Sequence, residues 1–491
     1  MQLYDKDLLS VQEVRELVAA AKKAQQELAG KTQAHVDRIV HSIANAGVRN
    51  AQRLAEMAVE ETGFGIVDDK VIKNIFASRM VYERVKDLKT IGEVARDDTL
   101  SVRTYAVPMG VVAGLIPSTN PTSTALFKAI IAVKAGNAIV FSPHPNAQRC
   151  ILQTVKVIRQ AIIEAGGNED LVCCITIPTI QATENLLRHP DTAMILATGG
   201  AAMVRAAYSS GTPAIGVGPG NGPSFIERSA DLPKAVSRIL ESKTFDNGTI
   251  CSSEQSVICE TDMKDAVKAE LIRQGAYFLT PEQAKKLGKF ILRGDGTMNP
   301  QIVGRSVQVI ARLAEIDVPP LTRVLIAEEN GVGRGHPYSN EKLAPILAFY
   351  CEDTFEKVCE RCQEILHYEG AGHTMTIHTQ DQEKVDYFAR NVPVSRIVVN
   401  SPGSLGGVGG TTGLFPSMTL GCGAIGGSAT SDNVGPMNLL NYRHVAYGIR
   451  EVSEIRADVP ECPDGICRTE IFPSVDVEEI VRKVIARLQL T

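Results

Sequence analysis

From about residue 100, the sequence alternates short apolar runs with longer stretches whose apolar residues recur at helical spacing. The apolar runs that predict strands are residues 111–116, 138–141, 171–177, 193–197 and 213–217. The helical patterns between them cover residues 122–134, 146–165, 180–188 and 200–209. Strands that alternate with helices form right-handed βαβ units, whose strands lie parallel in a sheet that helices cover on both faces. The alternation therefore predicts an α/β fold.

A second series of strand-like pieces follows, at residues 257–259, 324–327, 374–377 and 396–399. A chain of 491 residues is too long for one ordinary hydrophobic core. We therefore predict two α/β domains in tandem. Residues 10–60 precede both domains and predict two or three amphipathic helices, because residues such as Val36, Ile39 and Val40 recur at helical spacing.

Charge and cysteine usage exclude several classes of protein. The formal net charge of −5 argues against a broad nucleic-acid site. The 11 cysteines are scattered and form no framework of the kind that small secreted domains use. The first residues include acids where a signal peptide has basic residues, and the most apolar stretch, 129–141, is too short to span a bilayer. We expect a reducing cytoplasm and no nucleic-acid or membrane partner.

The composition of the sequence changes beyond Glu451, where turn-forming residues become frequent and predict a linker. A final amphipathic helix follows, with Asp476 as a plausible N-cap and one apolar stripe. The stripe consists of Val477, Ile480, Val481, Val484, Ile485 and Leu488. Two interpretations remain open: the helix packs on its own protein or an oligomer partner, or it docks into a groove of another protein.

One cysteine differs from the others in its surroundings. A buried cysteine is usually an inert hydrophobic residue, and strand-like runs hold Cys173, Cys174 and Cys259. The CxxC of Cys359 and Cys362 lies in a charged helical pattern without a second pair, so a zinc site is not expected. Cys251 lies in a polar, glycine-containing segment between a helix and a strand. Such a loop can present a thiol to a ligand, which makes Cys251 one candidate nucleophile among several.

The segment Asn247-Gly-Thr-Ile-Cys251-Ser-Ser-Glu-Gln255 resembles the nucleophile loop of the aldehyde dehydrogenase superfamily. Three more blocks follow that family's order: Ile116-Pro-Ser-Thr-Asn-Pro-Thr-Ser-Thr124, Ala197-Thr-Gly-Gly-Ala-Ala202 and Glu341-Lys-Leu-Ala-Pro345. The resemblance extends over roughly residues 5–450. It implies an aldehyde dehydrogenase-like α/β fold, in which two parallel-sheet domains, one Rossmann-like for cofactor and one catalytic, are joined by a small β oligomerisation arm.

The resemblance also implies domain boundaries. Residues 1–88 and 109–220 are expected to bind NAD and CoA, and residues 221–428 to form the catalytic domain. The oligomerisation arm is expected at 89–108 and 429–450, which would join homodimers or homotetramers. Residues 451–474 then form the linker and 475–491 the C-terminal helix.

Roles for individual residues follow from the same resemblance. Cys251 is the expected nucleophile, Asn120 the oxyanion amide, and Glu341 the contact to the nicotinamide ribose. His373, which follows Gly-Ala-Gly in a motif of the family, is interpreted as a contact to CoA or a proton acceptor, or else as a structural histidine. The residues expected to contact cofactor are Ile116, Pro117, Ser118, Thr119, Ser142, His144, Thr198, Gly199, Gly200, Val217, Gly218, Glu341 and Leu343. No metal site is expected.

Departures from the hydrolytic pattern point to a different acyl acceptor. Hydrolytic members carry a glutamate base at the position of Val217 and a ribose-binding lysine at the position of Ser142. Without a general base, water attacks a thioester slowly, whereas a thiol is a better nucleophile. The blocks Gly216-Val-Gly-Pro-Gly-Asn221, Glu369-Gly-Ala-Gly-His-Thr374 and Leu420-Gly-Cys-Gly423 are similar to the CoA-acylating branch. The nearby GxGxxG match at 421–426 is interpreted as a glycine-rich loop, because no convincing strand precedes it.

The sequence therefore predicts an NAD-dependent, CoA-acylating aldehyde dehydrogenase. Acetaldehyde or propionaldehyde is the expected substrate, since the linker and helix of the tail look like peptides that direct enzymes into bacterial microcompartments. The expected location is the bacterial cytoplasm, inside such a compartment, with a shell protein bound by 475–491. Three other functions are weighed against this prediction: a hydrolytic enzyme giving the free acid, a sulfoacetaldehyde-type or acyl-phosphate enzyme, and a non-catalytic scaffold.

Overall fold

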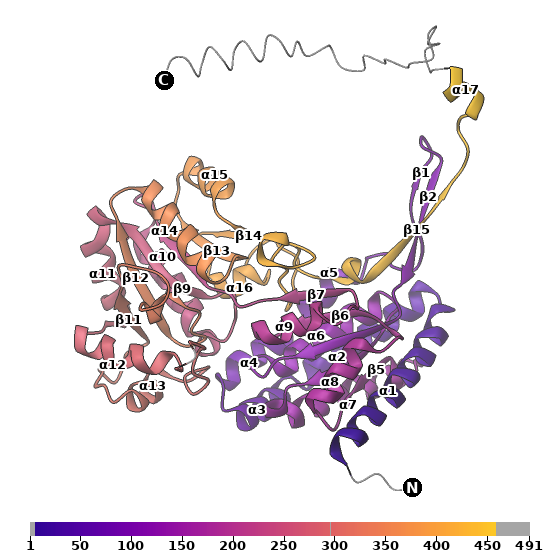
Figure 1. Ribbon diagram of the computed structural model, residues 1–491, viewed down its shortest axis with the longest axis horizontal. Helices are drawn as coiled ribbons and strands as arrows, with labels where there is room; N and C mark the ends of the chain where they lie inside the picture. Colours follow the sequence, from indigo (N-terminus) through magenta and orange to yellow (C-terminus); the bar gives the residue numbers. More distant parts are fainter. Residues whose placement is uncertain (1–4, 295, 458–491) are drawn as a thin grey trace, which may run out of the picture. The chain divides into compact units, whose positions relative to one another are not determined.

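The computed structural model describes residues 5–294 and 296–457 (Figure 1). Contacts divide these residues into two compact units. The first contains the described residues up to Val94 together with Ala106–Tyr442, and the second contains Ala95–Tyr105 and the described residues from Arg443. The predicted C-terminal helix at 475–491 and most of the predicted linker lie outside the described residues.

Three amphipathic helices open the chain, as their spacing predicts: α1 (Lys6–Ala29), α2 (Gln33–Arg49) and α3 (Ala51–Thr62). Side-chain oxygens of Asp5 and Thr32 accept backbone N–H bonds at the first turns of α1 and α2, which satisfies donors that a helix leaves free. Then α4 (Val67–Ile75) continues through a π-helical turn into α5 (Val81–Val85).

A five-stranded parallel sheet follows in the order β5-β4-β3-β6-β7. Its strands are β3 (Val111–Ile116), β4 (Ala138–Pro143), β5 (Val172–Cys174), β6 (Thr192–Thr198) and β7 (Ala214–Val217). The helices between them are α6 (Pro121–Lys134), α7 (Gln148–Glu164), α8 (Ile180–Arg188) and α9 (Ala201–Tyr208). The predicted series is therefore confirmed. β5 is much shorter than the predicted 171–177, because the N–H groups of Thr176 and Ile177 leave the ladder and donate to the Glu13 carboxylate.

Helix α6 is buried along all of its 14 residues, including two lysines. The Lys128 ammonium donates to the carbonyl oxygens of Leu115 and Leu196, at 2.7 and 2.8 Å. The Lys134 ammonium pairs with Asp37. Because buried charges are tolerated only when they are partnered, these contacts explain how a helix without a solvent face can carry lysines.

The second domain is built on a seven-stranded parallel sheet in the order β10-β11-β12-β9-β8-β13-β14. The strands that the sequence predicts are β9 (Glu254–Glu260), β11 (Val324–Glu328), β13 (Gly372–His378) and β14 (Val394–Val399). Those that it misses are β8 (Gly222–Ile226), β10 (Ala276–Phe278) and β12 (Ile346–Glu352). The helices are α10 (Leu232–Thr244), α11 (Lys264–Arg273), α12 (Pro281–Ile291), α13 (Val307–Leu313), α14 (Phe355–Tyr368), α15 (Gln382–Asn391) and α16 (Gly403–Gly407).

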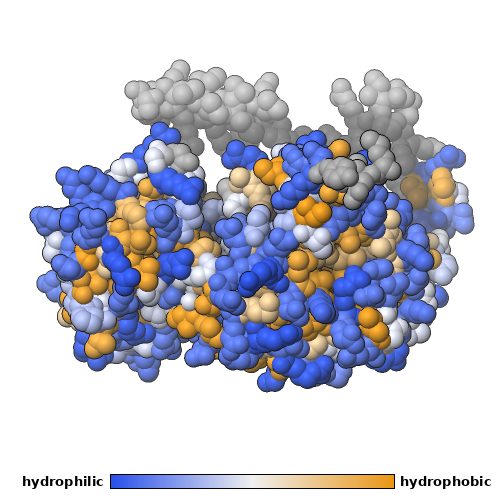
Figure 2. Space-filling view, turned by 90° about the horizontal axis from the view of Figure 1, so that it is seen from below, coloured by the Kyte–Doolittle hydropathy of each residue, from blue (hydrophilic) through white to orange (hydrophobic). Residues whose placement is uncertain are grey.

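A third sheet has three strands in the order β1-β2-β15. They are β1 (Gly92–Asp97), β2 (Val102–Pro108) and β15 (Leu440–Ala446), and α17 (Val452–Ala457) follows them. These strands fall where the sequence predicts the oligomerisation arm. Among the residues that the structure describes, no helix is long and apolar enough to cross a membrane. Figure 2 shows one face of the molecule, where hydrophobic side chains form patches among hydrophilic ones, as on ordinary folded proteins.

Candidate active site

The predicted nucleophile lies on a loop between a helix and a strand. Helix α10 ends at Thr244, and β9 begins at Glu254. Between them, Asp246 and Asn247 both adopt positive φ, 49° and 52°. Asp and Asn tolerate this left-handed conformation better than other residues with a side chain. The turn that they form leads to Cys251, whose side chain is half-buried.

A buried ion pair holds this loop in place. The Asp246 carboxylate lies between the ammonium groups of Lys70 and Lys73, both on α4. Burial alone would raise the pKa of the Asp246 carboxyl, but the two ammonium groups outweigh burial and the pKa lies below its ordinary value. The other carboxylate oxygen accepts the Ile66 N–H at 2.7 Å. The charges of α4 therefore anchor a loop that lies more than 170 residues away in the sequence.

Cys251 opens onto a cavity of about 490 Å³, which is lined by ends of β6 and β7 and by loops from several parts of the chain. Thirteen of the sixteen predicted site residues lie together around it. They are Pro117, Ser118, Thr119, Asn120, His144, Thr198, Gly199, Gly200, Val217, Gly218, Cys251, Glu341 and Leu343. The motif blocks, which are widely separated in the sequence, therefore converge on one space.

Asn120 connects β3 to α6 and turns its amide group toward the nucleophile loop. Its Nδ2 donates to the Thr249 carbonyl oxygen and to Thr119 Oγ1, both at 3.2 Å. Its Oδ1 accepts from Lys73 Nζ at 2.7 Å. An amide N–H group therefore lies beside the backbone two residues before Cys251, where an oxyanion formed on the thiol would need a donor.

Two acidic groups shape the electrostatics around the thiol. Burial, together with the Glu341 carboxyl, raises the pKa of the Cys251 thiol to about 12, while the Arg396 guanidinium opposes this rise. Burial and the nearby Glu369 also raise the pKa of Glu341 to about 8. Glu341 Oε1 accepts the Gly220 N–H at 2.9 Å, and the Glu341 N–H donates to Glu369 at 2.7 Å. Without ligands, the thiol is therefore protonated at neutral pH.

Three predicted site residues do not line the cavity: Ile116, Ser142 and His373. Ile116 is the last residue of β3 and is fully buried. Ser142 Oγ shares a hydrogen bond with Thr183 Oγ1 at 2.8 Å. Their contacts to cofactor stay predictions.

His373 lies behind the loop that precedes β8. A methyl group on Gly220 would be 2.0 Å from the Cys251 carbonyl oxygen and 3.3 Å from His373 Cε1, so the ring lies close to the nucleophile's backbone. Nδ1 lies 3.1 Å from Thr374 Oγ1, whereas Nε2 is buried without a hydrogen-bond partner. Burial and the Arg396 guanidinium lower the pKa of His373 to about 3. The ring is therefore neutral at physiological pH.

Other lining residues were not predicted. They are Phe64, Thr124, Asn146, Ala202, Met203, Pro219, Thr249, Ile250, Met298, Pro300, Val303, Val408, Met418 and Leu420. Thr249 and Ile250 lie inside the motif around Cys251, so their place in the cavity lining could have been predicted from that motif. Apolar residues such as Met298 and Val408 carry no chemistry that a pattern could reveal.

The position of the hydrolytic base is occupied by an aliphatic side chain. Val217 ends β7 and lines the cavity, and Gly218, Pro219 and Gly220 follow it toward β8. Its side chain can neither bind nor activate a water molecule, because it has no acceptor for a proton. At this position the cavity wall is apolar.

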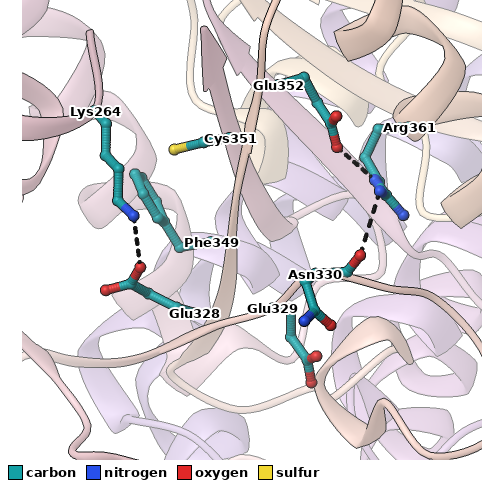
Figure 3. A pocket seen from close by; sticks show the side chains of 8 residues that line it. All are labelled: Lys264, Glu328, Glu329, Asn330, Phe349, Cys351, Glu352 and Arg361. Atoms are coloured by element: carbon teal, nitrogen blue, oxygen red, sulfur yellow. Dashed lines mark hydrogen bonds and ion pairs between the residues drawn. The ribbon is translucent and has the colours of Figure 1, made fainter. Parts of the chain in front are cut away.

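A second hollow contains none of the predicted site residues (Figure 3). Glu352 and Arg361 form an ion pair at one side of it, Lys264 and Glu328 form another at the opposite side, and Cys351 of β12 lies between the two pairs. Cys351 Sγ lies 3.7 Å from Cys259 Sγ, its register partner on β9. The hollow thus contains one of the two half-buried thiols among the described cysteines, the other being Cys251.

Two further sequence motifs can be placed in the fold. Cys359 and Cys362 are buried in α14, and no group of three potential metal ligands occurs among residues 5–294 and 296–457. The GxGxxG match at 421–426 is a loop with a 3-10 turn over Ala424–Gly426, and an isolated bridge joins Leu420, just before it, to Asn433. It does not begin a βα unit, so it lacks the context of a dinucleotide fingerprint.

Comparison with known proteins agrees with this arrangement. The pattern of the Aldehyde dehydrogenase family matches residues 3–285. The bifunctional aldehyde-alcohol dehydrogenase AdhE of Escherichia coli (strain K12) is 45% identical over 442 residues, which cover 89% of this chain and 50% of that protein. The succinate-semialdehyde dehydrogenase (acetylating) of Clostridium kluyveri is 37% identical over 438 residues, 89% of this chain and 96% of that protein. The chain thus spans about half the length of the bifunctional relative.

Solved structures show the same similarity. A probable aldehyde dehydrogenase of Listeria monocytogenes EGD-e is 61% identical, with a TM-score of 0.91 over 92% of this chain and 100% of that chain. An acetylating aldehyde dehydrogenase of Geobacillus thermoglucosidasius is 51% identical, with a TM-score of 0.90 over 91% and 99%. A propionaldehyde dehydrogenase of Rhodopseudomonas palustris, solved with bound CoA and an acylated cysteine, is 28% identical, with a TM-score of 0.79 over 88% and 97%.

The chain belongs to the aldehyde dehydrogenase family, whose fold and nucleophile loop it has. Within that family it groups with the acylating aldehyde dehydrogenases, which its relatives from Clostridium kluyveri and Geobacillus thermoglucosidasius represent.

Proposed function

We propose that this chain oxidises a short-chain aldehyde to its acyl-CoA with NAD, through a thioester on Cys251 that the CoA thiol releases. The lining of one cavity carries this proposal: it contains Cys251, Asn120 and Glu341 together with Val217 in place of a base. With NAD as the hydride acceptor, a thiol nucleophile and an oxyanion donor can form the thioester, and the aliphatic Val217 disfavours its hydrolysis.

In the first half-reaction, the Cys251 thiol releases its proton to solvent, its sulfur adds as thiolate to the aldehyde carbon, and the carbonyl electron pair moves onto oxygen. The Asn120 amide donates to that oxygen, and a preorganised donor of this kind contributes about 3 kcal/mol to transition-state stabilisation. NAD, when bound, supplies the hydride acceptor and a positive charge that favours the thiolate. Loss of hydride from the former aldehyde carbon leaves the thioester on Cys251.

In the second half-reaction, the CoA sulfur attacks the thioester carbon and the Cys251 sulfur leaves, so that acyl-CoA and the free cysteine are formed. The same Asn120 amide stabilises the tetrahedral oxyanion of this step. Because the acyl group passes through the enzyme, the kinetics should be ping-pong. The propionaldehyde dehydrogenase with bound CoA and an acylated cysteine supports this scheme by similarity.

The cavity fits a nucleotide cofactor at one end. Gly200 is the N-cap of α9 and makes no side-chain cap bond, and the first residues of the helix, Ala202 and Met203, also line the cavity. Free N–H groups at a helix start favour a pyrophosphate. A methyl group on Gly200 or Gly218 would meet no atom within 4 Å, so space for a ligand lies beside both. NAD is the proposed cofactor, although a structural neighbour, an engineered glycolyl-CoA reductase, was solved with NADP+.

The decisive assay is NADH formation with and without CoA. The proposal expects multiple turnovers only with CoA, and at most one turnover per site without it. Sustained NADH and free acid without CoA would establish the hydrolytic alternative instead. Cys251→Ala should abolish acyl-CoA formation and leave NAD binding nearly intact. Cys351→Ser, which removes the other half-buried thiol, is the matched control and should keep full activity.

Substrate and location are the finer parts of the proposal. Acetaldehyde and propionaldehyde are proposed as substrates, because the wall around Cys251 is formed by apolar side chains such as Ile250, Val303 and Leu420. A panel of C2 to C4 aldehydes and sulfoacetaldehyde, each with NAD or NADP, tests this. Preference for sulfoacetaldehyde would contradict it.

The tail at 475–491 is proposed to bind a microcompartment shell protein. Deleting residues 460–491 should leave activity intact and abolish co-purification with shells, and unchanged co-purification would contradict a targeting role. Homodimers or homotetramers are proposed to form through the arm, where Tyr442, Tyr447 and Ile449 are exposed. Sedimentation velocity of an Ile449→Asp variant tests that assignment.

A further inference from the structure

A buried lysine stands directly behind the proposed oxyanion donor. The Lys73 side chain is 3% exposed and does not line the cavity. Its Nζ lies 2.7 Å from Asn120 Oδ1, 2.9 Å from Thr249 Oγ1 and in contact with Asp246 Oδ2. An ammonium group has three hydrogens, so each of these oxygens receives one.

This arrangement determines which end of the Asn120 amide faces the reaction. An ammonium group only donates, so the oxygen of the amide must point at Lys73 and the NH2 group must point away from it. The NH2 group then reaches the Thr249 carbonyl oxygen at 3.2 Å, on the cavity side. A distance of 3.2 Å is at the long end for N–H···O bonds, whereas a bond to an oxyanion is shorter and stronger. The donor can therefore be redirected to an oxyanion without turning the amide over.

The charges around Lys73 also suit a developing negative charge. Asp246 balances one of the two ammonium groups, Lys70 and Lys73, and Lys70 donates to the Thr119 carbonyl oxygen rather than to Asn120. Asp69, also on α4, accepts the Asp246 N–H at 2.7 Å, and burial raises the pKa of its carboxyl. Burial lowers the pKa of Lys73 to about 8, and Asp246 opposes this fall. A charged Lys73 polarises the amide of Asn120 and makes its N–H a better donor.

We propose that Lys73 is a positioning residue of the acyl-transfer reaction: it holds Asn120 Oδ1 so that the Asn120 N–H group faces the oxyanion formed on Cys251. The proposal rests on the proposed role of Asn120. Lys73 acts through Asn120 and touches neither substrate nor cofactor. The sequence alone does not predict the contact between Lys73 and Asn120, because the two residues are 47 positions apart and belong to different elements.

A double-mutant cycle tests this role. Asn120→Ala should lower kcat by about 10²–10³-fold, as loss of one oxyanion donor does. Lys73→Met should lower kcat by roughly 10–100-fold, the scale of a catalytic group misplaced by about 1 Å. KM for NAD and CoA should stay within about threefold, because ground-state contacts are retained. In the double variant, Lys73→Met should add nothing further to the loss caused by Asn120→Ala.

Two variants guard against a purely structural explanation. Lys73→Met with Asp246→Asn removes the buried carboxylate together with one of its two cations, and the other cation, Lys70, still donates to the Thr119 carbonyl oxygen. Lys134→Met is the matched control, since Lys134 is a buried, ion-paired lysine at the other end of α6. A helix rises 1.5 Å per residue, so Lys134 lies about 20 Å along α6 from Asn120. The Lys134→Met variant should therefore keep the parent kcat.

The outcomes separate the two proposals. If Asn120→Ala keeps its activity, the oxyanion role of Asn120 fails and the role of Lys73 fails with it. If Asn120→Ala is impaired while Lys73→Met and its Asp246→Asn companion keep full kcat, only the Lys73 proposal is overturned. Independent, multiplicative losses in the double variant would also overturn it, because a residue that acts elsewhere adds its own effect.

Discussion

A single methyl group added at Gly220 should lower kcat strongly while the affinity for the nucleotide changes little. Gly220 lies on the segment between β7 and β8, and its backbone is not in the left-handed region, so only space requires glycine here. An alanine Cβ would be 2.0 Å from the Cys251 carbonyl oxygen. Since the closest ordinary C···O contact is about 3.3 Å, one of the two segments must move by about 1.3 Å.

That displacement acts directly on the nucleophile. Misplacement by about 1 Å costs roughly 10²-fold in rate, so Gly220→Ala should lower kcat by about that factor. Overpacking of this kind also costs typically about 1–3 kcal/mol of stability. The N–H of residue 220 still reaches Glu341, so affinity for the nucleotide should change much less than kcat.

Steady-state kinetics and urea unfolding measure both effects. Gly413→Ala is the control, since its Cβ would meet no atom within 4 Å and its φ is not positive. It should match the parent protein in both assays. If Gly220→Ala retained the parent kcat, the close contact between this segment and Cys251 would be wrong, and with it the geometry of the site.

Other expectations follow from titration and exposure. Burial raises the pKa of Glu254 from 4.5 to about 7. The folded protein therefore binds a proton that the unfolded chain has lost between these values, and stability falls as pH rises from about 4.5 to 7. Glu254→Gln should reduce the fall in unfolding free energy between these pH values by an amount on the order of 1–3 kcal/mol. Equal slopes of unfolding free energy against pH in the parent protein and the variant would refute this expectation. Iodoacetamide should label Cys351 before Cys251 in ligand-free protein, because the hydrogen bond from Cys259 and nearby lysines lower the pKa of Cys351 whereas burial raises the pKa of Cys251 to about 12. Peptide mass spectrometry gives the order, and labelling of Cys251, or of any of the seven buried cysteines among the described ones, before Cys351 would contradict it.

The sequence was sufficient for the architecture wherever strands and helices alternate with clear periods. It predicted β3, β4, β6 and β7 because each is an apolar run between helical patterns. It missed β8, whose Gly-Pro start is untypical of a strand, and β10, which has only three residues. It also missed β12, because a continuous apolar run does not reveal by its period whether it is a strand or a helix.

The sequence predicted those site residues that belong to recognisable motifs. Cys251, Asn120 and Glu341 stand in motifs, and the structure brings them to one cavity. The groups that hold them do not stand in motifs: Lys73 belongs to an amphipathic helix, where a lysine is ordinarily exposed. Only the fold shows that this lysine is buried, since pairing across 173 residues with Asp246 leaves no local trace.

The burial of α6 has a consequence for how such an enzyme can change over evolutionary time. Asn120 immediately precedes a helix without a solvent face, so a residue exchanged in the first turns of that helix disturbs packing on all sides and shifts the position of the amide. Another part of the lining, Met298, Pro300 and Val303, belongs to a loop, and loops tolerate exchange better than core elements. New aldehyde preferences should therefore arise on the loop side, while the oxyanion side stays fixed by the core on which it is built.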